Sequence, residues 1–65
     1  MSKYGEILCR MRLEKGMTQE TLAQLADVSR NAIANYETNR SVPNTDRFEA
    51  ILDVLGYELV IRRKR

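Results

Sequence analysis

The 65-residue sequence contains a single cysteine, Cys9, and no histidine. No disulfide can therefore form within the chain, and no zinc site built from histidine and cysteine is available. Nothing in the sequence supplies an activated nucleophile or a general base with a raised pKa, which disfavours an enzyme. We therefore expect neither a metal nor any other cofactor.

Long apolar runs are also absent. No segment approaches the roughly 18 residues needed to span a bilayer, and the N-terminal Met-Ser-Lys-Tyr lacks the basic-then-apolar layout of a signal peptide. We expect a soluble, cytoplasmic protein. A chain of 65 residues makes one small domain, near the lower limit at which a hydrophobic core alone offsets chain entropy.

Charge is unevenly distributed. The net charge is +2, yet residues 1–61 hold seven basic against nine acidic residues, so the final four residues supply the whole surplus. Three arginines lie in or near residues 28–40, and three acidic residues follow later: Arg30, Arg40, Arg47, Glu49, Asp53 and Glu58. This asymmetry predicts a mildly positive face around residues 28–40.

Apolar spacing and capping residues predict an all-α fold, a small bundle of four helices. The first should cover residues 3–15, and the second should begin after the N-cap Thr18. Ser29 caps a third helix that ends near residue 38, and Asn44 caps a fourth that runs to residue 55. The expected core residues, helix by helix, are Tyr4, Ile7, Leu8 and Met11; Leu22, Ala23, Leu25 and Ala26; Ala32, Ile33 and Tyr36; and Phe48, Ile51, Leu52 and Leu55.

Two apolar residues of the first helix, Cys9 and Leu13, fall opposite its core stripe. They are either isolated exposed side chains, which are common, or part of a surface that faces a partner.

The C-terminal segment has a different pattern. Residues 57–62 are β-branched and aromatic, with alternating side chains, and no other segment looks like their partner strand. We therefore predict a short β-strand that pairs with a second copy across a two-fold axis. Dimerisation would rest on Tyr57, Leu59, Val60 and Ile61. The alternatives are an extension of the fourth helix or a frayed tail.

The basic residues 62–65 have two interpretations. Terminal charge runs are commonly solvated and disordered, or they contact a DNA backbone or an acidic partner.

The predicted third helix presents a flat polar face. At about 100° per residue, Arg30, Asn31, Ala34 and Asn35 lie opposite the apolar residues. Two short helices joined by a tight turn form the arrangement that lays the second helix in the DNA major groove. Asparagine can pair with adenine through two hydrogen bonds, arginine can bind guanine or phosphate, and alanine can touch a thymine methyl. Periodicity alone also allows a helical bundle that binds no DNA.

The segment RLEKGMTQETLAQLADVSRNAIANYETNRSVPN, followed by ILDVLG, resembles the Cro and repressor (XRE-like) type of helix-turn-helix domain. The resemblance covers residues 4–56, leaving residues 57–65 as the strand and basic tail. It implies base reading by Arg30, Asn31, Ala34 and Asn35. It further implies DNA-backbone contacts by Thr18, Gln19, Ser29, Asn39 and Arg40, and a structural ion pair between Arg12 and Glu37.

The resemblance implies a dimeric transcriptional repressor of prokaryotic or phage type, bound to double-stranded DNA at a palindromic operator. The strand-like ending resembles that of small antitoxin-type repressors, so an antitoxin that neutralises a toxin protein is the alternative. The sequence departs from the family pattern at Asp27 and Asn39, where glycine is usual; both types tolerate positive φ better than most residues.

Overall fold

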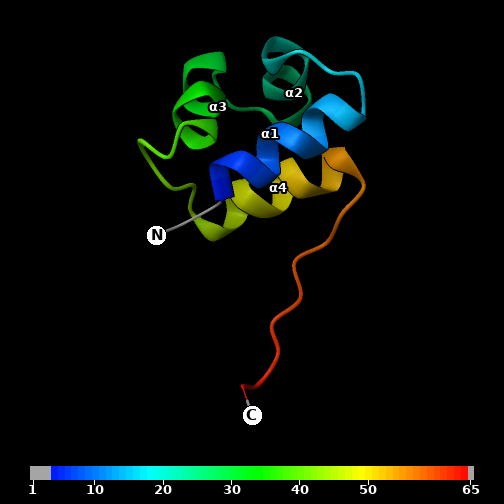
Figure 1. The fold of residues 1–65 in the computed structure, drawn as a ribbon, viewed down its shortest axis with the longest axis vertical. Coiled ribbons are helices and arrows are strands. Elements are labelled where there is room, and N and C mark those ends of the chain that lie inside the picture. The colour runs from blue at the N-terminus through cyan, green and yellow to red at the C-terminus, as the bar shows by residue number, and fades with distance from the viewer. Residues whose placement is uncertain (1–3, 65) are drawn as a thin grey trace.

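The computed structural model describes residues 4–64, which form a four-helix, all-α fold (Figure 1). The helices are α1 (Tyr4–Glu14), α2 (Gln19–Ala26), α3 (Arg30–Glu37) and α4 (Thr45–Leu55). Helix α3 packs against both α1 and α2, and α2 also packs against α4. Each predicted helix is present, and within the described range none is long and apolar enough to cross a bilayer.

Side-chain caps start three of the helices. The hydroxyl of Thr18 accepts a hydrogen bond from the N–H of Thr21 at 3.0 Å, and the hydroxyl of Ser29 accepts one from Ala32 at 3.0 Å. The amide oxygen of Asn44 accepts one from the N–H of Arg47 at 2.8 Å. Each cap satisfies one of the amide groups that the first turn of a helix leaves unpaired.

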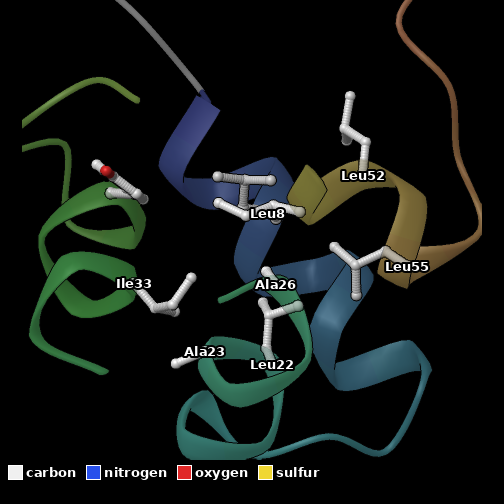
Figure 2. Packing of buried hydrophobic residues seen from close by; sticks show 9 residues of the cluster. Leu8, Leu22, Ala23, Ala26, Ile33, Leu52 and Leu55 are labelled. Carbon is white, nitrogen blue, oxygen red and sulfur yellow. The ribbon is translucent and has the colours of Figure 1, made fainter. Parts of the chain in front are cut away.

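The core draws residues from all four helices (Figure 2). The buried hydrophobic residues are Leu8, Leu22, Ala23, Ala26, Ile33, Tyr36, Ile51, Leu52 and Leu55. All nine were expected from helical periodicity. Met11, Ala32 and Phe48 pack against this cluster while staying partly exposed.

Three expected core residues are exposed, namely Tyr4, Ile7 and Leu25. In α1 the buried positions are 5, 8 and 12, so the stripe is rotated away from the predicted one. This rotation turns Gly5 and Arg12 toward α3. A search for apolar periodicity does not select glycine or arginine. Leu25 is 60% exposed because α2 buries only the side that carries positions 22, 23 and 26.

The N-terminus of α1 lies against the C-terminal end of α3. The N–H of Gly5 donates to the amide oxygen of Asn39 at 3.1 Å. A Cβ atom at Gly5 would lie 2.7 Å from the carbonyl oxygen of Tyr36, so only glycine permits this approach. Asn39 itself has a φ of 61°, the left-handed conformation expected from its place after the third helix.

The C-terminal segment leaves the helical body without regular secondary structure over residues 57–64 (Figure 1). Helix α4 does not continue into it. Gly56 has a φ of 85°, and the N–H of Tyr57 bonds the carbonyl of Leu52 at 2.8 Å, which closes the helix. The predicted strand is absent from the single chain because strand hydrogen bonds require a second strand, and residues 4–64 contain none. Pairing between two copies stays a prediction.

Candidate nucleic-acid interface

A turn of three residues joins α2 to α3. Asp27 adopts the left-handed conformation with a φ of 57°, and the N–H of Val28 donates to the carbonyl of Ala23 at 2.9 Å. Ser29 then caps α3. Asp27 therefore takes the conformation for which the family usually has glycine, and the turn keeps the short geometry of a helix-turn-helix.

Helix α3 separates its apolar and polar sides. Ile33 and Tyr36 are 1% and 5% exposed and point into the core, whereas Arg30 and Asn31 are exposed. Ala34 and Asn35 are half-buried. The four residues predicted to read bases thus share the outer part of α3, with the two nearest its N-terminus reaching furthest into solvent.

A buried ion pair holds α3 against α1. The Arg12 Nε donates to Glu37 Oε2 at 2.7 Å, and Arg12 Nη2 donates to Glu37 Oε1 at 3.0 Å. The two side chains are only 10% and 5% exposed. Arg12 Nη1 also donates to the carbonyl of Met17 at 2.8 Å. This fork geometry is the strong form of an arginine–carboxylate pair.

Glu37 also binds α2, because Gln19 Nε2 donates to Glu37 Oε1 at 3.1 Å. Burial raises the pKa of Glu37, but hydrogen bonds from Arg12 and Gln19 and the charge of Arg12 outweigh burial and leave that pKa below its ordinary value. The hydrogen bond to Glu37 raises the pKa of Arg12. Both groups are therefore charged at neutral pH, and one carboxylate ties three helices together.

The residues predicted to contact the DNA backbone lie at both ends of α3. A surface hollow beside the N-terminus of α2 is lined in part by Thr18, Gln19 and Arg30. Asn39 and Arg40 follow the other end of the helix, where the N–H of Arg40 donates to the carbonyl of Asn35 at 2.9 Å.

Several of these polar groups also form hydrogen bonds within the fold. The hydroxyls of Thr18 and Ser29 cap helices, and the amide oxygen of Asn39 accepts the N–H of Gly5. The NH₂ group of Gln19 has two hydrogens, and its bond to Glu37 uses one. Their side chains are therefore held in place before any ligand arrives.

Two features that hold α3 in place were not predicted from the sequence. One is the bond from Gln19 to Glu37, for which helical periodicity gives no signal because it joins separate helices. The other is Gly5, whose place three residues before Leu8 on the first helix is the only sequence indication that it faces the interior.

Residues 10–61 match the helix-turn-helix family. The chain is 36% identical over 60 residues to an HTH-type transcriptional regulatory protein of Aeropyrum pernix, an alignment that covers 92% of this chain and 18% of that protein. The chain thus spans about a fifth of that curated relative.

Two solved structures share the fold. A tyrosine-to-alanine mutant of the restriction-modification controller protein C.Esp1396I superposes with a TM-score of 0.82 at 37% identity, covering 88% of this chain and 74% of that one. The DNA-binding domain of the P22 C2 repressor superposes with a TM-score of 0.83 at 25% identity, covering 89% and 79%. The chain therefore belongs to the helix-turn-helix family.

Proposed function

We propose that this chain is a sequence-specific transcriptional repressor that binds a palindromic operator as a dimer, with α3 as the recognition helix. The observation that carries the proposal is the outer face of α3. There Arg30, Asn31 and Asn35 stand around the small Ala34, while the opposite side is fixed by Ile33 and Tyr36 in the core. A short helix with a rigid, low polar face fits the floor of the major groove.

Each residue of this face has a distinct chemical task. The amides of Asn31 and Asn35 can both donate and accept, which suits the N6 and N7 edge of adenine. The guanidinium of Arg30 can form two bonds to guanine or bind a nearby phosphate. Ala34 leaves room for the base edges and can contact a thymine methyl.

Backbone contacts would place α3 in the groove. Thr18, Gln19 and Ser29 lie before or at the N-terminal end of the two helices of the motif, and Asn39 and Arg40 follow α3. Phosphates on the two sides of one groove can therefore be bound from both ends of the recognition helix. Such contacts set register and affinity and carry little sequence information.

A dimer would place two copies of α3 in successive major grooves, about 34 Å apart on one face of the duplex. A two-fold symmetric protein then selects a two-fold symmetric site. Repression follows where such a site overlaps a promoter, and the similar structures include a protein named as a repressor.

Selection of bound duplexes from a random DNA pool tests the proposal. The wild type should enrich a two-fold symmetric site, and the Asn31→Ala/Asn35→Ala variant should lose that preference. Each asparagine should contribute roughly 1 to 3 kcal/mol of discrimination at one base position.

Arg40→Ala is the matched control, because it should weaken binding to all sequences alike while leaving the selected site unchanged. If a folded wild type enriches no sequence at moderate salt, the proposal is wrong. Uniform weakening by the asparagine changes would instead show that another face reads the bases.

A further inference from the structure

Exposed apolar side chains are concentrated in the C-terminal segment. Tyr57, Leu59, Val60 and Ile61 are 47%, 38%, 59% and 88% exposed. Four such residues within five positions are costly to leave in water, and nothing in residues 4–64 covers Ile61. The segment therefore has the character of one half of an interface.

The order of residues in this segment is self-complementary. Reading outward from Val60, Leu59 and Ile61 are both apolar, Glu58 and Arg62 carry opposite charges, and Tyr57 and Arg63 form an aromatic and cationic pair. Two such segments running antiparallel would match every residue with a suitable partner.

We propose that residues 57–63 of two copies pair as an antiparallel ribbon in a single register, with Val60 of one copy opposite Val60 of the other. Glu58 then faces Arg62 of the second copy, and Leu59 faces its Ile61. This inference rests on the dimer proposed above and adds the register and the residues that select it.

Symmetry leaves few other registers. The two-fold axis of a flat antiparallel ribbon is perpendicular to the sheet, so the central residue must face its own copy. A centre at Ile61 would set Val60 against Arg62 and Leu59 against Arg63. A centre at Arg62 would set two like charges against each other. A centre at Leu59 would set Glu58 against Val60.

The helical body favours the same register. Tyr57, Glu58 and Leu59 line an apolar groove between α1 and α4 whose other walls include Ile7 and Phe48. Side chains alternate along a strand, so in the ribbon the odd-numbered residues face this groove together and Glu58 turns away from it toward Arg62 of the second copy. Centring on Val60 sets Ile61 of the second copy beside Leu59, which buries the most exposed apolar residue of the segment against the groove. An isolated two-stranded ribbon is only marginally stable, so this packing is needed.

Charge exchange between two variants tests the register. Glu58→Arg alone places like charges opposite each other twice in a dimer, and so does Arg62→Glu. We expect each variant alone to raise the dimer dissociation constant about tenfold or more at low ionic strength. An equimolar mixture of the two should restore wild-type affinity, because every heterodimer then has two opposite-charge pairs. Sedimentation equilibrium without DNA measures the dimer dissociation constants of the single variants and of their mixture.

A mixture of Glu58→Arg with Arg63→Glu is the control, because it has the same total charge but leaves two positive charges opposed at positions 58 and 62. If this control mixture recovers as fully as the first, general charge attraction explains the result and the register is wrong. Wild-type affinity for either single variant would also overturn the register while leaving the dimer intact. A wild type that stays monomeric would overturn the dimer itself. DNA site selection is a separate experiment, so a failure of the register and a failure of DNA binding can be told apart.

Discussion

Arg12 and Glu37 place two opposite charges inside a very small protein. Their side chains are 10% and 5% exposed, and three hydrogen bonds to Glu37 from α1 and α2 compensate the loss of water. Breaking such a pair leaves one buried charge without compensation, which costs more than the intact pair contributes. The pair therefore acts by fixing the position of α3 against α1.

Glu37→Gln should lower the free energy of unfolding by roughly 3 to 5 kcal/mol, because Arg12 stays buried without its counter-charge. Urea denaturation at pH 7 measures this loss. Glu49→Gln, which alters an exposed acid on α4, is the control and should change stability by less than about 0.5 kcal/mol.

The same pair predicts a pH dependence. The pKa of Glu37 is lowered in the folded state, so its contribution is fully present above the pKa of the unfolded chain. That contribution is lost as the pH falls through the folded-state pKa. Wild-type stability should thus decline in acid more steeply than that of Glu37→Gln. Parallel acid profiles for the two proteins would contradict this assignment.

At the scale of elements, the junction between α1 and α3 positions α3, the helix that we propose reads the bases. Gly5 lies against the last carbonyls of α3, and the amide oxygen of Asn39 accepts a hydrogen bond from the N–H of Gly5. Arg12 holds the same two helices together about two turns further along α1. Both contacts fall at residues 36–39, so together they fix the C-terminal end of α3 against α1.

The Gly5→Ala substitution distinguishes the effect of helix propensity from the effect of packing between α1 and α3. Alanine in a helix should gain up to about 1 kcal/mol over glycine, but here its Cβ would meet backbone atoms of α3. We expect a net loss of about 1 to 3 kcal/mol, seen as a lower thermal midpoint. Glu6→Ala, at the exposed neighbouring position, should leave the midpoint nearly unchanged. A higher midpoint for Gly5→Ala would mean that the two helices pack less closely in solution.

At the scale of the whole molecule, the helical core and the C-terminal segment are separable. The buried core ends at Leu55 and includes no residue of the segment 57–64. The helical domain should therefore fold without the segment, while association of two copies should depend on it.

Truncation after Gly56 tests this division. The wild type should melt at a higher temperature as its concentration rises, because dimerisation stabilises the folded state by mass action. The truncated chain should keep its helical circular dichroism and lose the concentration dependence. A truncated chain that dimerises as tightly as the wild type would exclude the ribbon.

The sequence by itself determined the helices and their ends. Caps such as Thr18, Ser29 and Asn44, and the left-handed position of Asn39, follow from local hydrogen bonding and backbone sterics that act within a few residues. The polar face of α3 was predictable for the same reason, since it depends only on the helical repeat.

Only the tertiary structure decided which side of α1 faces the core. Apolar spacing predicted Tyr4 and Ile7, but the interior holds Gly5, Leu8 and Arg12, because close approach to α3 requires a residue without a side chain and a partner for Glu37. The bond between Gln19 and Glu37 was likewise invisible, since it joins residues from separate helices. Local rules fix each helix, whereas the rotation of one helix against another depends on side chains distant in sequence.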